Sequence, residues 1–169
     1  MKYARPAFVI FVLLTLQTTL IADLQAFGAT GDIMMLLPIA AGISGGRDRG
    51  AVVGFVTGLA FDLVVHGTPL GFFALGYTLV GYIVGAMQAG VLRAAWWIPV
   101  VTAFGGSVLG IVTLAVVGEF LGFEHLFDRH LLTICAVVAV VNAALVLPML
   151  RVVRWSMPLV TRSGRLVPT

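Results

Sequence analysis

The chain has 169 residues, of which 60% are hydrophobic and only 10% are charged. A soluble domain carries a charged shell of roughly a quarter of its residues, so this composition excludes an ordinary water-soluble domain and favours a surface that faces lipid. The net charge of +3 does not indicate a nucleic-acid partner, because the basic residues lie between apolar runs and form no stripe on a polar face.

The first predicted helix covers residues 6–22 and follows a basic start. It has features of a signal peptide, but the apolar run is long and no small-x-small cleavage site follows it. We therefore expect a retained transmembrane helix, with a cleaved signal as the alternative. Gln17, Thr18 and Thr19 lie in its outer half, where they could form hydrogen bonds with neighbouring helices.

The second predicted helix, 32–46, is short and contains Pro38. It rises about 21 Å, less than the ~30 Å hydrocarbon core, so it either spans the membrane with Asp32 at its outer mouth or re-enters. If it spans, nine of the ten basic residues are cytoplasmic and only Arg129 is outside. The positive-inside bias therefore predicts an all-α bundle of about six transmembrane helices with both termini cytoplasmic.

The third predicted helix, 50–65, carries glycines at intervals of four residues: Gly50, Gly54 and Gly58. These glycines share one helix face, which lets a neighbouring backbone approach closely. Asp62 and His66 continue the stripe. The expected partners are the fourth and fifth helices, whose own glycines are Gly81, Gly85, Gly106 and Gly110.

Asp62 is the only ionisable residue that this topology places well inside a span, roughly 18 Å from the cytoplasmic edge. A carboxylate at that depth costs a few kcal/mol on insertion scales, so it should face the bundle. It is either a structural group hydrogen-bonded to helix ends or to His66, or a ligand, proton or partner site.

The remaining predicted helices cover 69–92, 94–118 and 131–153, the last with Asn142 at its middle. Between the last two, the outer segment 119–130 places Phe120, Phe123 and Phe127 on one side of a short helix. Such a segment lies in the membrane interface or offers an aromatic face to a partner. His125 and His130 match no standard ligand spacing, so no metal site is expected.

One catalytic motif occurs, Gly-x-Ser-x-Gly around Ser44, which also fits the rhomboid protease signature. A serine nucleophile needs a base within about 3 Å. The predicted topology places the histidines on the opposite side of the membrane, of order 25 Å away. Cys135, the only cysteine, cannot form an intramolecular disulfide and is expected to be a packing residue. The sequence therefore predicts no enzyme and no cofactor.

Several groups of residues occur in a characteristic order and spacing over about half of the chain. They are Leu16, Gln17, Thr18, Thr19, Leu20, Asp32, Arg47, Arg49, Gly50, Gly54, Gly58, Leu59, Asp62, Leu63, Pro69, Leu70, Gly71, Ala74, Leu75, Leu79, Val80, Gly81, Tyr82 and Gly85. In these residues the chain resembles the rod shape-determining protein MreD family. It departs from the family at Gly31, where a proline often precedes the acidic residue.

The resemblance implies a non-catalytic membrane scaffold subunit of the bacterial cell-elongation complex, which supports peptidoglycan synthesis and rod shape. It implies MreC as a partner, together with the SEDS glycosyltransferase, a class B penicillin-binding protein and the actin-like MreB. The family is similar in fold to the S components of energy-coupling-factor transporters. The alternative is therefore a small-molecule-binding transporter subunit, for which Asp62, His66 and Gln17 are the candidate polar groups.

Overall fold

The computed structural model describes residues 4–24, 32–88, 97–122 and 129–157. Over these residues the fold is all-α, as predicted, and each predicted segment contains one helix. The helices are α1 (Ala4–Leu24), α2 (Leu36–Gly45), α3 (Arg47–Asp62), α4 (Phe72–Gln88), α5 (Ile98–Phe120) and α6 (Arg129–Ser156).

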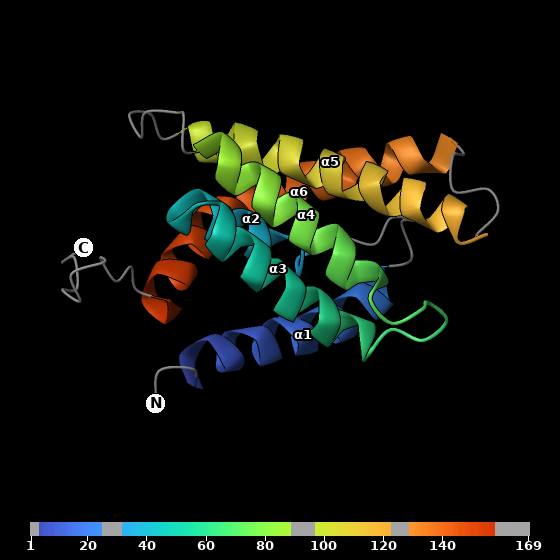
Figure 1. The fold of residues 1–169 in the computed structure, drawn as a ribbon, viewed down its shortest axis with the longest axis horizontal. Helices are drawn as coiled ribbons and strands as arrows, with labels where there is room; N and C mark the ends of the chain where they lie inside the picture. The colour runs from blue at the N-terminus through green and yellow to red at the C-terminus, as the bar shows by residue number, and fades with distance from the viewer. Residues whose placement is uncertain (1–3, 25–31, 89–96, 123–128, 158–169) are drawn as a thin grey trace.

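Successive helices run in alternating directions along the long axis of the molecule (Figure 1). The start of α1, the turn between α2 and α3 and the end of α6 lie at the left of Figure 1, and the connection from α3 to α4 lies at the right. A contact between helix ends supports this arrangement: the Arg5 guanidinium at the start of α1 lies 5.4 Å from the ring centroid of Trp155 at the end of α6. The basic ends of α1, α3 and α6 therefore gather at one end of the bundle.

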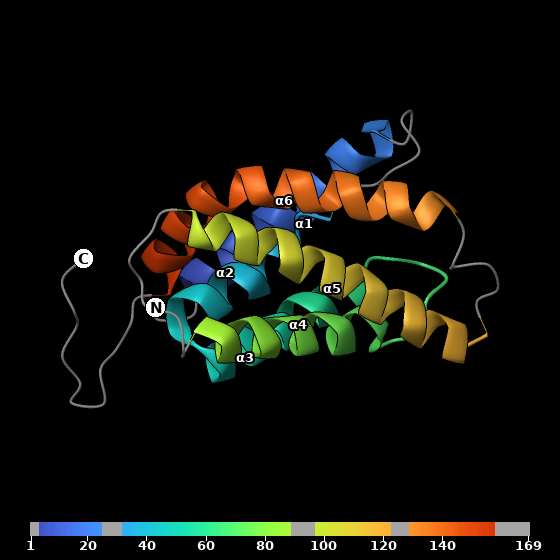
Figure 2. The same ribbon diagram turned by 90° about the horizontal axis from the view of Figure 1, so that it is seen from above.

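The short helix α2 lies at the centre of the core. Its residues Leu36, Leu37, Ile39, Ala40 and Ala41 are fully buried. It packs against α3, α4, α5 and α6, and Figure 2 shows it between the α3–α4 pair and α6. By contrast, α1 packs along the side of the bundle, against α6 and α3.

The boundaries of α2 differ from the predicted helix 32–46. Residues 32–35 form a hydrogen-bonded turn in which the Leu36 amide donates to the Ile33 carbonyl at 3.1 Å, and the helix covers only Leu36–Gly45. Gly46 follows the last residue of α2, and its φ of +81° lets α3 begin at the next residue. Glycine adopts this backbone conformation without steric cost.

The connection between α3 and α4 is longer than predicted. α3 ends at Asp62 rather than at residue 65, and α4 begins at Phe72 rather than at residue 69. The intervening loop contains Gly67 and Gly71 at φ values of +96° and +100°, which do not belong to a right-handed helix. This loop brings the start of α4 back against the end of α3.

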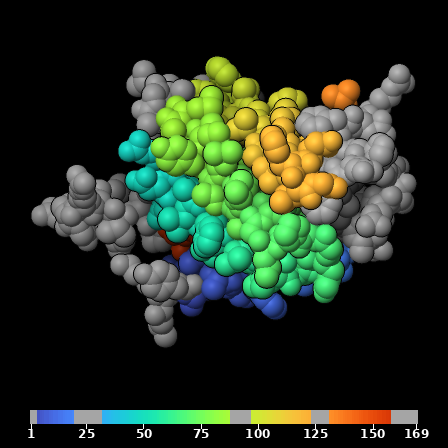
Figure 3. Space-filling view, turned by 45° about the vertical axis from the view of Figure 1, so that its right-hand side comes forward, coloured from blue at the N-terminus to red at the C-terminus, as the bar shows by residue number. Residues whose placement is uncertain are grey.

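The outer surface of the bundle is apolar. Figure 3 shows one face, on which α3 and α4 lie side by side next to the end of α5. The large apolar side chains exposed on these helices include Val52, Phe55, Val56 and Leu59 of α3, Leu75, Leu79 and Tyr82 of α4, and Val101, Phe104 and Val112 of α5. In a soluble protein a surface of this kind would be an aggregation liability.

Among the described helices, two are long and apolar enough to cross a membrane by length and composition: Ile98–Phe120 and Leu131–Ser156. Ala4–Thr19, Leu36–Gly45 and Phe72–Met87 are shorter apolar helices. α3 differs from all of these because it begins with three charged residues, Arg47 to Arg49.

Candidate functional site

The glycine face predicted on the third helix lies directly against the backbone of α4. A Cβ atom added at Gly58 would lie 2.5 Å from the Cα of Ala74. Cβ atoms added at Gly50 and Gly54 would collide with the carbonyl oxygens of Gly81 and Tyr77. The prediction that the fourth helix is the partner of this face is therefore confirmed. We call Gly50, Gly54 and Gly58, with Gly81 and Gly85 of α4, the glycine seam.

The α2–α3 turn closes the same seam at its basic end. A Cβ added at Gly85 would lie 2.5 Å from the Cα of Arg47, and one added at Gly42 would lie 2.8 Å from the Gly81 carbonyl oxygen. Three helices therefore meet within backbone contact distance. Only residues without a side chain permit such close packing.

The fifth helix does not take part in the seam, so this second predicted partner is wrong. In the described residues α3 makes no contact with α5. A Cβ added at Gly106 would lie 3.0 Å from Val84 and 3.3 Å from Ile39, and one added at Gly110 would lie 3.1 Å from Val80. The α5 glycines thus face α2 and α4, because α2 occupies the position next to α3.

Asp62, the last residue of α3, is a structural carboxylate that is 4% exposed. It accepts three backbone hydrogen bonds at the start of α4, from the amides of Gly71 (3.0 Å), Phe73 (3.0 Å) and Ala74 (3.1 Å). The first amides of a helix have no partner inside the helix, and an anion there is stabilised by the helix dipole. Of the two roles predicted for Asp62, the structural one fits this geometry, because the carboxylate is hydrogen-bonded to the end of a helix.

His66 does not continue the stripe of Asp62, contrary to the prediction. α3 ends at Asp62, and His66 lies exposed in the following loop. The Asp62 carboxylate accepts three hydrogen bonds from backbone amides, as described above. The helical spacing that placed the two side chains on one face therefore ends before it reaches the histidine.

A second carboxylate, the half-buried Asp32, is the centre of a polar cluster that the sequence did not predict. Its Oδ1 accepts a hydrogen bond from the Met35 amide at 3.1 Å, and its Oδ2 accepts one from the Tyr77 hydroxyl at 2.6 Å. Its backbone carbonyl accepts a hydrogen bond from Nδ2 of Asn142 at 3.2 Å, and the same nitrogen donates to Oγ of Ser107 at 2.8 Å. The cluster thus joins α4, α5 and α6 to the turn that leads into α2.

This cluster lies within the bundle, whereas the prediction placed Asp32 at the outer mouth of a spanning helix. α2 has 10 residues and so rises only about 15 Å. Its N-terminus therefore stops level with Asn142, which is fully buried halfway along α6. The partners of Asp32, Tyr77 and Asn142, were not readable from the sequence, because 45 and 110 residues separate them from Asp32.

Gln17 anchors α1 to the same region. Its side chain is 5% exposed, and Oε1 accepts a hydrogen bond from the Ile33 amide at 3.0 Å. The predicted contact of Gln17 outside its own helix is confirmed. The prediction for Thr18 is wrong, because this exposed hydroxyl donates to the carbonyl of Thr15 in the same helix. Thr19 is exposed.

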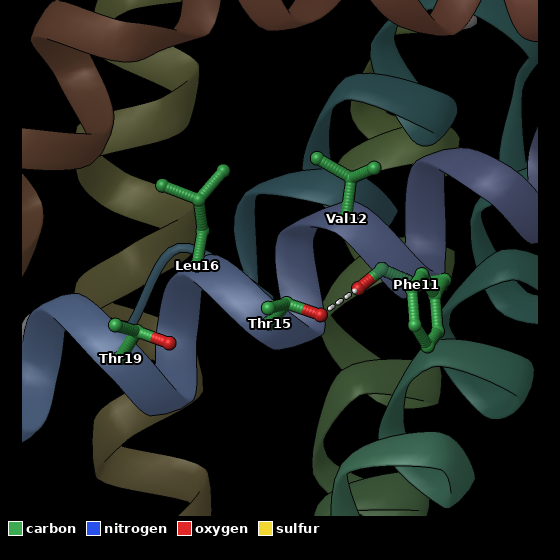
Figure 4. A pocket seen from close by; sticks show the side chains of 5 residues that line it. All are labelled: Phe11, Val12, Thr15, Leu16 and Thr19. Carbon is green, nitrogen blue, oxygen red and sulfur yellow. Dashed lines mark hydrogen bonds between the residues drawn. The ribbon is translucent and has the colours of Figure 1, made fainter.

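The outer side of α1 carries an open groove of about 380 Å³. Figure 4 shows the five side chains that line it, which are Phe11, Val12, Thr15, Leu16 and Thr19. The Thr15 hydroxyl donates to the Phe11 carbonyl at 2.9 Å, so its polarity is satisfied within the helix. The groove offers apolar contact and no charge.

The outer aromatic segment is described only in part. Phe120 is the last residue of α5 and is 88% exposed, so α5 extends two residues into the segment predicted as 119–130. Phe123, Phe127 and His125 lie outside the described residues, as does the side chain of His130. The predicted amphipathic face of this segment therefore remains a prediction.

Ser44 and Cys135 have ordinary structural surroundings. The buried Ser44 hydroxyl donates to the Ala41 carbonyl of its own helix at 3.3 Å. Cys135 is a buried member of the hydrophobic core, as predicted. Within the described residues, no group of three or more histidine, cysteine, aspartate or glutamate side chains could hold a metal ion.

Comparison with known proteins gives no match: no family model, no curated protein and no solved structure corresponds to this chain. The site must therefore be interpreted from its own geometry. Its polar groups hold helices together, and its glycines bring backbones into contact.

Proposed function

We propose that the chain is a multi-pass protein of the bacterial cytoplasmic membrane, with six membrane-crossing helices and both termini in the cytoplasm. The alternating helix directions and the gathering of arginines at one end of the bundle support this orientation. The apolar outer side chains support a lipid environment. Short α2 forms part of its crossing, from the basic end of the bundle to the level of Asn142.

We further propose that the protein is a non-catalytic scaffold subunit of the cell-elongation complex, of the MreD type. It binds MreC and, through it or beside it, the SEDS glycosyltransferase, the class B penicillin-binding protein and MreB. In this role the bundle presents rigid helix surfaces within the membrane, and it converts no substrate.

The main support for the scaffold proposal is that buried polar groups form hydrogen bonds within the chain itself. A solute-binding site needs a few convergent polar groups that are free to hold a ligand. Of the three candidates for such a site, Asp62 accepts three backbone amides, Gln17 accepts another, and His66 is exposed in a loop. This favours the scaffold over the transporter-subunit alternative.

The glycine seam limits where partners bind. Its α3 and α4 glycines are already in backbone contact with each other, so a partner helix meets other surfaces. Exposed apolar side chains remain on α1, α3, α4, α5 and α6, for example Phe11, Phe55, Leu75, Val101 and Val140.

The proposal is tested by co-expression with MreC and by site-directed photo-crosslinking. A photoreactive residue is placed singly at Phe11, Phe55 or Val101, which are 67%, 52% and 59% exposed, and at the buried Val138 as a control. We expect co-purification in detergent and crosslinks from one exposed face but none from Val138. Absence of association, with and without crosslinking, would reject the scaffold proposal. Saturable binding of a vitamin or metal that is lost in Asp62→Ala would favour the transporter subunit.

A further inference from the structure

The end of α6, residues 149–156, has one buried and one exposed side. It follows Pro148, which lies inside the helix. Its buried residues are Met149, Leu150, Val153 and Ser156. On the opposite side Arg151, Arg154 and Trp155 are exposed. Arg151 precedes Arg154 by three residues and Trp155 by four, so it is a neighbour of both on the helix surface.

Arg5 of α1 adds a third guanidinium group to this side of α6. It is exposed, and its guanidinium carbon lies 5.4 Å from the ring centroid of Trp155. Stacking on an aromatic ring uses the face of a guanidinium, whose N–H donors lie in its plane and suit the oxygens of a phosphate. We call Arg5, Arg151, Arg154 and Trp155 the arginine–tryptophan patch. It combines residue types that are typical of a membrane interface.

The arginine–tryptophan patch lies in a region of excess positive charge. At this end of the bundle the described arginines are Arg5, Arg47, Arg49, Arg151 and Arg154. Asp48 is the acidic residue that the described part of the chain places there, and its Oδ1 lies 3.6 Å from Nε of Arg47. The segments 1–3, 89–96 and 158–169, which adjoin these helices in the sequence, add four basic residues and no aspartate or glutamate. The charge at this end therefore favours an anion.

The exposed side of α1 continues from the patch as an apolar surface. Exposed residues follow Arg5 at intervals of three or four and so share its helix face: Phe8, Val12, Leu16 and Thr19. The groove shown in Figure 4 runs along this side from Phe11 to Thr19. At 1.5 Å per residue, it begins about 9 Å and ends about 21 Å from Arg5 along the helix axis. An acyl chain that fills half of the hydrocarbon core is about 15 Å long, so a lipid with its phosphate at Arg5 would place this chain over the groove.

We propose that the arginine–tryptophan patch and the groove of α1 together bind an anionic phospholipid of the cytoplasmic leaflet. The lipid phosphate accepts hydrogen bonds from the guanidinium groups, and one acyl chain lies along the groove. A lipid fits better than a free anion or an acidic protein segment, because the charged patch and the apolar groove lie along the same side of one helix. The inference rests on the membrane location and orientation proposed above.

Native mass spectrometry of the full-length protein tests the proposal. The protein is released from detergent micelles that contain equal amounts of phosphatidylglycerol and phosphatidylcholine with identical acyl chains, and the retained lipid is measured. The wild-type protein should retain phosphatidylglycerol in preference. Arg5→Gln should lower this preference about fivefold, which corresponds to ~1 kcal/mol for one basic residue near an anionic lipid, and Arg5→Lys should preserve it. Equal retention of the two lipids by the wild-type protein would overturn the proposal.

The matched control for Arg5 is Arg47→Gln, which removes an arginine from the same end of the bundle. Arg47 is already paired with Asp48, so its loss should change the lipid preference little. If Arg47→Gln and Arg5→Gln had equal effects, general attraction to the basic end would account for the binding, and the assigned site would be wrong. All of these positions are exposed, so circular dichroism should show unchanged helix content.

The groove is tested by Leu16→Ser, with Leu75→Ser on the exposed side of α4 as its control. Leu16→Ser should lower the retention of phosphatidylglycerol, and Leu75→Ser should not. Equal retention by the two variants would overturn the placement of the acyl chain.

The class of ligand is tested by competition at constant ionic strength. Neither inorganic phosphate nor a soluble glutamate-rich peptide should displace the lipid, compared with sodium chloride. Displacement by either one would assign the patch to a free anion or to an acidic partner and would overturn the lipid proposal. Co-purification with MreC is scored separately, so failure of the lipid site can be distinguished from failure of the scaffold function.

Discussion

The Tyr77 hydroxyl donates a 2.6 Å hydrogen bond to Oδ2 of Asp32, which lies 45 residues earlier in the chain. The distance falls in the range of hydrogen bonds to charged or strongly polar oxygens. Tyr77 is fully buried, and its backbone also contacts Gly54 in the glycine seam. One residue of α4 therefore connects the polar cluster with the closest helix pair.

Tyr77→Phe should destabilise the protein without changing its helix content. The variant keeps the ring, which lies 5.8 Å from the ring of Phe73, but leaves Asp32 with one side-chain donor fewer. Removing one partner of a buried hydrogen bond costs about 1–3 kcal/mol. Thermal unfolding in detergent, followed by circular dichroism, measures the loss. The control is Tyr82→Phe on the exposed side of α4, and equal Tm values for the two variants would contradict this role.

Gly54→Ala should weaken the pairing of α3 with α4. The new methyl group would collide with the Tyr77 carbonyl, which belongs to the helix backbone and cannot rotate away. Overpacking of this kind costs about 1–3 kcal/mol.

The matched control for Gly54 is Gly105→Ala in α5, where an added Cβ meets no atom within 4 Å. Alanine is favoured over glycine inside a helix by up to about 1 kcal/mol, so this control should leave the Tm unchanged or raise it. If Gly54→Ala were as stable as Gly105→Ala, the seam would not be closely packed in solution.

Asp62→Asn should loosen the start of α4. An amide oxygen accepts fewer hydrogen bonds than a carboxylate, and the amide NH₂ group faces backbone amides that are themselves donors. We expect a loss of about 1–3 kcal/mol and faster hydrogen exchange at Phe73 and Ala74. The control Asp48→Asn is exposed and should change neither quantity. Unaltered exchange at these two amides would refute the capping role of Asp62.

Membrane sidedness is tested by cysteine labelling in a Cys135→Ser background. Asp48→Cys in the α2–α3 turn should react with an impermeant maleimide only after the cytoplasmic side is exposed. Leu70→Cys, at a loop position that is 72% exposed, should react in intact cells whose outer membrane is permeable. If Asp48→Cys were labelled from outside, the proposed orientation would be reversed.

The sequence by itself determined the helical class, the six helical segments of the described residues and the face of α3 that packs. Apolar runs separated by polar or charged residues predict the helices, since a helix satisfies its backbone hydrogen bonds within one segment. Glycines at intervals of four define a face, because the helical period is a local property of the chain. Both signals lie within one segment and need no knowledge of distant residues. The same local period placed His66 wrongly, because it does not show where a helix ends.

Only the tertiary structure decided what the polar residues contact. Asp32 and Asp62 both precede helices in the sequence, yet one lies in the middle of the bundle and the other at its end. The difference arises because α2 is short and central. The turn that precedes it therefore lies inside the bundle, where Asp32 contacts Tyr77 and Asn142. Such pairings depend on how helices pack in three dimensions, and packing joins residues whose separation along the chain carries no local signal.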